Sequence, residues 1–598
     1  MSVNNILNVS KSGIYAAQNT LQTVSHNIAN ANTPGYSRQT VALQNAPLGL
    51  GVQINDISRQ LDTLLDRRQE LGVGELGSLE TKDRFLAQIE QIFNEADKDG
   101  LSVRLDSLYA AADNLVDNPT NPVGRAEFVT KADSTARYMQ DMHNRLAGLL
   151  TPVDQEVDVL LADVNNRLKA LRDINAVLSG SGSTDPSADL QDQRRQMVLE
   201  LGKLIDIQTL EVPGGGLQIM MAGGQGLLAD SVHAATLVRS KNNAVDPTFP
   251  VAPGTPPKLT NFRGITLDDR DVLKVQGGAL GGLLEIRDTV INGKNGALTQ
   301  LEALADEMRY QFNLIGSTAV SQGMYSSQTG VFSLGTDLGL QAMSDLSDDP
   351  LADMYAHSPA DLSRVVDGEI VFASGADGDH LTTISRVTVR KGMTISQVLE
   401  AINEADAVDA NVTADNRLQI QAANGRVYGV VSDSSHVLAA LGIGALFGGK
   451  GAGDIALNPV LADDSRQLGV GKMVSKKEDL NDPTRVTNVV FNDGDNQAAL
   501  AVSRLRTTKF EISGRTASLT GSYAATVGML GAVINQNKES LTAQQAAQTF
   551  IGQMRESTSG VSMEEELTDL MRFQRAFQAS SKMVSTADEL MQTIINMV

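Results

Sequence analysis

The two ends of the chain carry apolar residues at a repeat of seven. In the first 32 residues, a row of large apolar residues is followed three positions on by a row of mostly small ones: Leu7, Ile14, Leu21 and Ile28, then Ser10, Ala17, Val24 and Ala31. The last 36 residues repeat the pattern: Met563, Leu570, Phe577, Val584 and Met591, then Phe573, Ser580, Ala587 and Ile594. This spacing of 3.5 is typical of a coiled coil. Because a helix cannot bury such a stripe alone, we expect the two ends to pair with each other or with another chain, rather than to be ordinary amphipathic helices on a globular core.

Composition narrows the class of partner. The chain has 598 residues, too many for one hydrophobic core, so three or four domains are expected. Its net charge of -22 argues against binding to nucleic acid or to anionic membranes. The absence of cysteine excludes disulfides, thiolate zinc sites and a thiol nucleophile. No long apolar run and no secretory signal are recognisable, so we expect neither a membrane span nor a cleaved signal peptide.

A turn motif follows the first predicted helix, which we expect to end near Ala31. In the sequence Thr33-Pro34-Gly35-Tyr36, Pro34 fixes φ at the second position of a turn and Gly35 supplies the positive φ that a type II turn needs next. Extended segments are expected after this turn, and then a helix over residues 57–71.

The middle of the chain alternates between helical and strand patterns. Residues 76–180 are expected to be helical, with an apolar row that repeats in sevens and with Pro152 as a kink or a new start: Leu150, Val157, Val164, Leu171 and Leu178. Strands are expected at 207–212, 217–221 and 227–229, and again, around a helix at 394–405, at 382–389, 411–413, 417–422 and 426–431. Asn424-Gly425 is a type I′ hairpin signal.

This order predicts a multidomain α plus β fold in which insertions are nested. The termini pair innermost as an α-helical coiled coil, a long helical domain follows, and β-rich and α+β insertions lie outermost. The expected domains are 1–33 with 557–598 (terminal coiled coil), 34–205 with 270–329 and 490–556 (mainly helical), 206–269 (small and β-rich), and 330–489 (outer α+β insertion).

Three short motifs suggest ligand sites, but each lacks a necessary part. The glycines of 72–77 have the spacing of a dinucleotide-binding loop, yet a helix and not a strand is predicted before them. Residues 444–451 nearly match a phosphate-binding loop, but Gly451 replaces the Ser or Thr that would bind magnesium. A loop resembling an EF-hand has poor ligands at its first and last positions: Glu95, Asp97, Asp99, Gly100 and Asp106. Loose connections and solvated turns explain these motifs, so no cofactor and no metal site is predicted.

The six histidines are scattered through the sequence, without a zinc-protease or serine-hydrolase motif. A Ser-His-Asp site could still assemble in space. Since no motif favours an enzyme, no catalytic residue is predicted.

Several stretches carry a family resemblance. Residues 25–38 (SHNIANANTPGYSR) resemble the N-terminal signature of the bacterial flagellar rod, hook and hook-associated proteins. Residues 559–566 and 573–580 resemble the closing signature of the same family, with Phe577 near the position of a usual tyrosine. Stretches 189–195 and 277–288 favour, within the family, the member at the junction between hook and filament.

The resemblance implies a structural protein of the flagellum, secreted through the flagellar type III channel as an unfolded chain without signal cleavage. It implies contacts with hook protein, with hook-associated protein 3 and with copies of itself in a ring, and an export chaperone at the C-terminal helix. We call the apolar rows of the two ends the terminal seams. In the free subunit we expect these seams to lack partners and to be largely disordered. The residues expected to carry assembly are Leu7, Ile14, Leu21, Ile28, Asn30, Pro34, Gly35, Tyr36, Met563, Leu570, Phe573, Phe577, Val584, Met591 and Ile594.

Three alternatives remain open. The chain could be another hook- or rod-type axial protein. An extracellular coiled-coil adhesin would also be acidic and free of cysteine, but it would not need the turn motif and would usually carry a secretion signal. An enzyme domain within 330–485 is the third, and the lack of any recognisable catalytic motif there argues against it.

Overall fold

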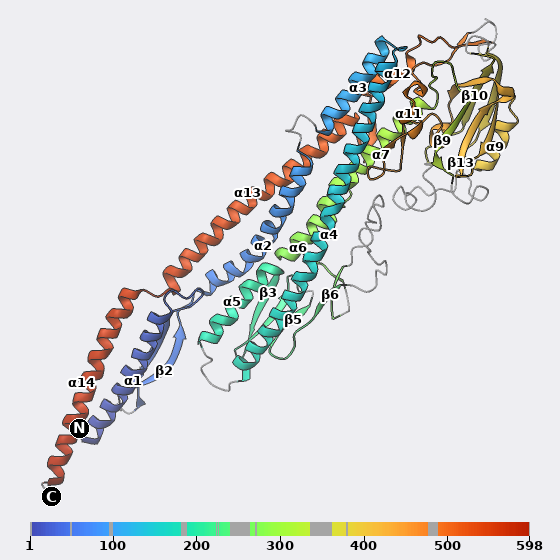
Figure 1. Ribbon diagram of the computed structural model, residues 1–598. Coiled ribbons are helices and arrows are strands. Elements are labelled where there is room, and N and C mark those ends of the chain that lie inside the picture. The colour runs from blue at the N-terminus through green and yellow to red at the C-terminus, as the bar shows by residue number, and fades with distance from the viewer. Residues whose placement is uncertain are drawn as a thin grey trace.

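The computed structural model is a long rod with both chain ends near one tip (Figure 1). The structure describes residues 3–47, 51–94, 100–180, 188–213, 215–222, 224, 226–239, 264–268, 272–334, 362–377, 381–476 and 488–596. A terminal helix pair at this tip is followed by a long helical domain with a small β module beside it, and then by an outer domain at the far end. The predicted multidomain fold, with nested insertions and paired termini, is confirmed.

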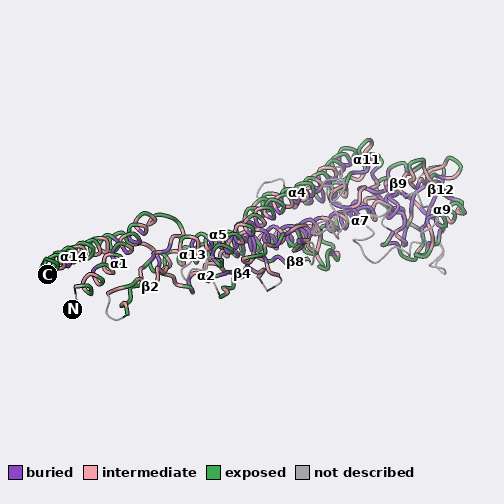
Figure 2. Tube along the Cα trace, turned by 90° about the horizontal axis from the view of Figure 1, so that it is seen from below, coloured by how far each residue is buried: buried purple, intermediate pink, exposed green. Residues whose placement is uncertain are grey.

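The terminal helix pair consists of α1 (Val3–Asn30) and α14 (Met563–Asn596), which lie side by side. A hairpin of β1 (Gln39–Asn45) and β2 (Val52–Arg59) lies beside α1. The buried positions of α1 include a stripe with a 3.5 spacing: Ser10, Ala17, Thr20, Val24 and Asn27. The predicted row of large residues is only half-buried, and Figure 2 shows that much of α14 is exposed.

Two expectations for this region are wrong. The seams do not lack a partner, because α1 and α14 pair within one chain. Small side chains allow this approach, since a Cβ added at Gly13 would lie only 2.9 Å from Oγ of Ser580. The helix expected over 57–71 is also misplaced, because residues up to Arg59 pair with β1. The helix begins after Asp62, whose carboxylate caps the amides of Leu64 and Leu65.

Long helices form the central rod. Their bounds are α2 (Thr63–Ile92), α3 (Leu101–Asp117), α4 (Pro122–Gly180), α5 (Ala188–Leu204), α6 (Gly278–Glu285), the π-helix η3 (Ile286–Ile291), α7 (Ala297–Gly316), α12 (Gln497–Arg504) and α13 (Leu519–Ser559). The hairpin of β19 (Phe510–Ile512) and β20 (Arg515–Ala517) precedes α13. The predicted apolar row on α4 is buried along its whole length, and α4 continues through Pro152.

The glycine motif at residues 72–77 lies inside α2 and is not a loose connection. A Cβ on Gly77 would lie 2.1 Å from the carbonyl oxygen of Lys203, and one on Gly74 would lie 3.2 Å from that of Gly202. On Gly72 it would meet the side chain of Gln548. The glycines therefore let α5 and α13 pack closely on α2, which gives the motif a structural cause.

The small β module lies beside α4 and α5 (Figure 1). It contains two antiparallel sheets, β3 (Ile207–Val212), β4 (Gly216–Met221) and β5 (Leu227–Ala229), then β6 (Leu237–Arg239), β7 (Ile265–Leu267) and β8 (Val272–Leu273). The three strands predicted for the first sheet are confirmed. The proline-rich stretch near 246–258 lies outside the described residues.

The outer domain contains two antiparallel sheets around an aromatic core that includes Phe332, Phe372 and Tyr428. One sheet has the order β11-β10-β14 and the other β12-β13-β9, with α9 beside them: β9 (Ser327–Ser333), β10 (Gly368–Gly375), β11 (Leu381–Val389), α9 (Ile395–Asn403), β12 (Val408–Val412), β13 (Arg417–Ala422) and β14 (Val427–Asp433). Asn424 and Gly425 have the predicted positive φ. They do not close a hairpin, since β13 and β14 belong to different sheets.

The chain returns to the rod after α10 (Val437–Ala440). It passes through β15 (Phe447–Gly448), β16 (Ala456–Leu457), α11 (Pro459–Asp463), the 3-10 helix η5 (Ser465–Gln467), β17 (Val474–Lys476) and β18 (Asn488–Val490). Leu446, Ile455, Leu461 and Val470 pack in the core of the helical domain and not in the core of the outer domain. We therefore propose that the continuous part of the outer domain ends near residue 443, earlier than the border expected at 489. Met473 and Val489 then return to pack against Ala373 and Leu381 of the outer sheet.

Candidate assembly site at the base of the terminal helix pair

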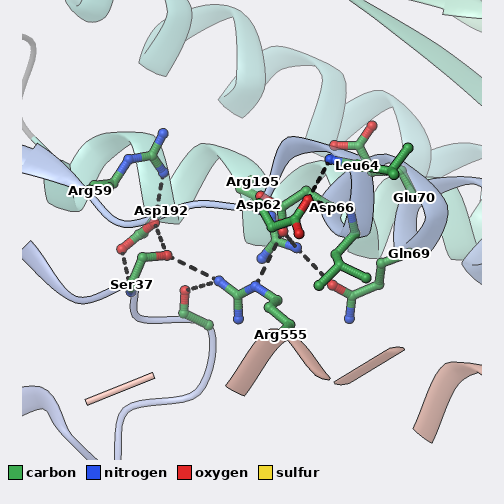
Figure 3. Close-up of polar contacts among 12 residues, drawn as sticks. Ser37, Arg59, Asp62, Leu64, Asp66, Gln69, Glu70, Asp192, Arg195 and Arg555 are labelled. Atoms are coloured by element: carbon green, nitrogen blue, oxygen red, sulfur yellow. Dashed lines mark hydrogen bonds and ion pairs between the residues drawn. The ribbon is translucent and has the colours of Figure 1, made fainter. Parts of the chain in front are cut away.

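The candidate site lies where the terminal pair meets the rod. The turn after α1, the start of α2, α5, the end of α13 and the start of α14 come together there (Figures 1 and 3). The predicted type II turn is present: the amide of Tyr36 donates to the carbonyl of Thr33 (3.2 Å), and Gly35 has a φ of 84°. This turn directs the chain from α1 towards α5.

Asp192 on α5 holds the segment that leaves the turn. Its carboxylate accepts hydrogen bonds from the amide (2.8 Å) and the hydroxyl (3.0 Å) of Ser37, and it lies 2.7 Å from Nη1 of Arg59 at the end of β2. Asp192 and Ser37 are both buried. Because a buried carboxylate is stable only with charged or hydrogen-bonding partners, these contacts fix the open end of the β1–β2 hairpin, where β1 starts and β2 ends, against α5.

Asp66 in the first turn of α2 lies between two arginines (Figure 3). Its Oδ1 is 3.3 Å from Nε of Arg555 on α13 and also contacts Nη2 of Arg195 on α5. Arg555 donates further hydrogen bonds to the carbonyl of Gly35 (3.2 Å) and the hydroxyl of Ser37 (3.1 Å). Burial lowers the pKa of Arg195, and the charge of Arg555 lowers it further. The turn, α2, α5 and α13 thus share one network of charges.

Glu566 joins this site from α14. Its side chain is 1% exposed, and its carboxylate accepts from Nε of Arg38 (2.6 Å) and from Nδ2 of Asn27 (3.1 Å). Arg38 also pairs with Glu565 (2.9 Å) and lies 3.8 Å from Asp569. One arginine therefore gathers three carboxylates of the first turns of α14, and Asn27 connects them to α1.

Tyr36 completes the contact between the turn and α1. Its hydroxyl donates to Oδ1 of Asn27 (2.7 Å) and lies 3.2 Å from Nδ1 of His26. Burial raises the pKa of Tyr36, and the charges of Asp189 and Asp192 raise it further. The phenol therefore stays protonated and keeps its role as a donor.

The predicted assembly residues divide into two groups. Asn30, Pro34, Gly35 and Tyr36 form or flank the turn in the site. The seam residues lie along the two terminal helices: half-buried are Leu7, Ile14, Leu21, Ile28, Leu570, Phe573, Val584 and Met591, and more exposed are Met563, Phe577 and Ile594. The seam residues are therefore set apart from the charge network that anchors the pair.

Sequence reasoning gave no role to the charged residues of the network. Arg38, Asp192, Arg195 and Glu566 lie in the stretches that carry the family resemblance, which was the available signal. Asp66 and Arg555 lie outside those stretches and are 489 positions apart. Nothing in a single sequence pairs two charges at that separation.

In the loop that nearly matches a phosphate-binding motif, carboxylates of the same chain bind the backbone amides. The amides of Lys450 and Gly451 donate to Asp454 (2.7 and 2.9 Å), and the amide of Ala452 donates to Glu302 of α7 (2.7 Å). These donors are consumed, and the loop is held in place, contrary to the loose loop expected.

The other motifs also have structural explanations or fall outside the structure. Positions 95–99 of the EF-hand-like stretch lie outside the described residues, while Asp106 is in α3 and pairs with Arg506 (3.2 Å). Among the described residues, no group of three or more His, Asp or Glu side chains is placed to hold a metal ion. Within the same part of the chain, no helix is both long and apolar enough to cross a membrane.

Comparisons with known proteins agree with this architecture. The profile of "Flagellar hook-associated protein FlgK helical domain" matches residues 86–330, that of "Flagella basal body rod protein" matches residues 7–36, and that of "Flagellar basal body rod FlgEFG protein C-terminal" matches residues 553–597. The last two profiles cover parts of the two terminal helices that pair in the structure.

Similar proteins extend over the full length. Flagellar hook-associated protein 1 of Salmonella typhimurium is 24% identical over 608 residues, covering 99% of this chain and 100% of the relative. The protein of that name from Bacillus subtilis is 23% identical, covering 99% of this chain and 97% of the relative. The structure of the flagellar hook junction protein FlgK from Burkholderia pseudomallei shares the fold, with a TM-score of 0.50 and 14% identity over 82% of this chain and 100% of that chain.

A rod whose terminal helices pair at one end, with rod-protein profiles on both helices, defines a structural protein of the bacterial flagellum. Within that class, the chain is similar over its full length to flagellar hook-associated protein 1, and it is a structural protein of the junction between hook and filament.

Proposed function

We propose that copies of this chain form a ring that joins the hook to the filament, with the terminal helix pair as the part that enters the assembly. The observation that carries this proposal is an incompletely covered helix pair fixed by a charge network to a long rod. In this arrangement hook protein lies on one side of the ring and hook-associated protein 3 on the other.

The driving force for assembly is apolar surface that the chain does not cover by itself. α14 exposes a set of large apolar side chains: Met563, Leu567, Met571, Phe577, Met583, Leu590, Ile594 and Ile595. Burying each of them fully against a neighbouring copy contributes about 1.5–3 kcal/mol. The entropy cost of ordering the helices subtracts from this gain. Assembly therefore requires several neighbours to act together.

The same exposed surface needs protection before assembly. We propose that an export chaperone covers α14 in the cytoplasm and that the chain passes unfolded through the flagellar type III channel without signal cleavage. The absence of cysteine supports this route, because no disulfide can trap the chain in transit. The function is one of binding and positioning, without catalysis.

The test is electron microscopy of a strain that lacks this chain, together with an assay of flagellin in the medium. We expect hooks without filaments and flagellin lost to the medium, both restored by the full chain. Normal filaments in the deletion strain would contradict the junction role and favour another axial position or an adhesin.

A further inference from the structure

Apolar residues recur at a nearly regular seven-residue spacing in both α1 and α14. Apolar packing alone therefore does not define how far along α1 each residue of α14 lies. Two contacts give the alignment observed: Asn27 with Glu566, and Gly13 with Ser580. From the first contact to the second, the residue number falls by 14 in α1 and rises by 14 in α14, as expected for antiparallel helices. Rows at a seven-residue spacing offer similar apolar contacts after a shift of one repeat.

Glu566 does not tolerate such a shift. In the observed alignment its 1% exposed carboxylate receives Nδ2 of Asn27 and Nε of Arg38. A shift of one repeat in one direction would place it opposite Thr20, whose hydroxyl already donates to the carbonyl of Ala16 (2.8 Å). A shift in the other direction would place it opposite Pro34, which has no amide hydrogen.

Arg38 also has a fixed position. Its own amide donates to the carbonyl of Ser559 (2.9 Å), which anchors this residue to the end of α13. Asn27 is held as well, because its Oδ1 accepts from the amide of Gln39 (3.0 Å) and its Nδ2 donates to the carbonyl of Gln39 (2.9 Å). The donors for Glu566 therefore cannot follow α14 if it slides.

We propose that Glu566, together with Asn27 and Arg38, sets the alignment of α14 against α1 by excluding shifts of one seven-residue repeat. This inference rests on the proposed role of the helix pair in assembly and names the residue that fixes its alignment. A shift of one repeat moves α14 by about 10 Å along its axis, at 1.5 Å per residue. Such a shift would displace the exposed side chains of α14 relative to the rod and misalign them with a neighbouring copy.

The chain contains no cysteine, so engineered cysteine pairs can report the alignment without interference. A Cβ built on Gly13 lies 3.7 Å from Cβ of Ser580, within the range for a disulfide. The pair G13C with S580C reports the observed alignment. The pairs G13C with F573C and G13C with A587C report shifts by one repeat in either direction. Each pair is oxidised in the full chain and quantified by peptide mass spectrometry.

The test compares Glu566→Leu with the matched control Glu564→Leu, an exposed neighbour in the same run of acidic residues. Without either substitution, and in the control, we expect the 13–580 disulfide and neither shifted product. In Glu566→Leu the yield of the 13–580 disulfide should fall while a shifted disulfide becomes a major product. A fall without any shifted product would overturn the inference and leave Glu566 a stabilising role only, and an unchanged yield would overturn it as well. Failure of the 13–580 pair to form without either substitution would overturn the pairing itself, and with it the proposed function.

Discussion

Asp192 accepts two hydrogen bonds from Ser37, one from the amide (2.8 Å) and one from the hydroxyl (3.0 Å). This contact attaches the chain leaving the terminal pair to α5, a helix of the rod. Since Arg59 pairs with the same carboxylate, one residue of the rod holds both strands of the β1–β2 hairpin at its open end.

Replacing Asp192 by alanine should loosen the terminal pair without unfolding the rod. The change leaves Arg59 without its carboxylate, and loss of one partner from a buried pair costs about 3–5 kcal/mol. Hydrogen exchange should show loss of protection at the amide of Ser37 and in the hairpin. The matched control is Asp173→Ala on the exposed face of α4, which should leave this region unchanged. Equal protection in both variants would contradict the anchoring role.

Two glycines of the rod should respond oppositely to the same substitution. At Gly77 a Cβ would lie 2.1 Å from the carbonyl of Lys203, so Gly77→Ala should force α2 from α5 and cost about 1–3 kcal/mol. At Gly148, which is exposed on α4 with nothing within 4 Å, alanine should stabilise the helix by up to about 1 kcal/mol. Thermal unfolding of the helical domain measures both changes. A Gly77→Ala protein as stable as the unsubstituted chain would mean that α2 and α5 are not in close contact.

The attachment of the 448–455 loop to the rod should depend on pH. Nε2 of buried His143 on α4 lies 2.8 Å from Oε1 of Glu302. Burial alone would lower the pKa of His143, but hydrogen bonding to Glu302, the charge of Glu302 and the charge of Asp454 raise it above its ordinary value. His143 thus binds its proton more tightly in the folded state than in the unfolded state.

A histidine whose pKa is higher in the folded than in the unfolded state stabilises the fold fully at pH values below its unfolded pKa of about 6.5. This contribution is lost as the pH rises through the folded pKa. We therefore expect amide exchange in the loop to quicken over that window in the unsubstituted chain, and to change less in His143→Gln. His233, which is half-exposed near Asp268, provides the control as His233→Gln. The same pH profile with and without His143 would contradict this assignment.

A charge on the exposed side of α14 should block assembly while the rod stays folded. Phe577 is 36% exposed, and Phe577→Asp would place a carboxylate where a neighbouring copy would bury the ring. We expect a normal thermal transition of the helical domain but loss of the protein from isolated hooks. Gln578→Asp, at an exposed polar neighbour, should assemble normally. Retention of Phe577→Asp in hooks would show that this face of α14 is not buried on assembly.

The terminal pair should be the first part of the free chain to open. Two helices with half-exposed seams bury less surface than the rod does, so local opening costs less there. Limited proteolysis should trim both ends to a core of about 45–555. Equal resistance of both ends and the rod would contradict this order of stability.

The sequence was informative where a period or a turn determines the structure. The row from Leu150 to Leu178 predicted the buried face of α4, and Pro34-Gly35 predicted the turn. The seam of α1 was predicted in part. Its small row is buried at Ser10, Ala17 and Val24, whereas the row of large residues is only half-buried because close packing favours the small ones. The glycines of α2 were taken for a loose connection because the backbone of α5 that requires them lies 126 positions away, as from Gln69 to Arg195.

The charge network was beyond sequence reasoning for a different reason. Charged residues such as Asp66 and Arg555 have no periodicity, and their burial follows from how α2, α5 and α13 meet the turn after α1. A single sequence shows neither which helices pack together nor which charged residues pair. Only the resemblance stretches drew attention to Arg38, Asp192 and Glu566, without giving them a role.

The outer domain enters and leaves the rod at the same end, far from both termini (Figure 1). Its own aromatic core is separate from the core of the rod. The exposed turn at Asn424 and Gly425 therefore offers a place for a fluorescent label or an epitope that leaves the helix pair untouched. Single junctions could then be followed on growing flagella in living cells.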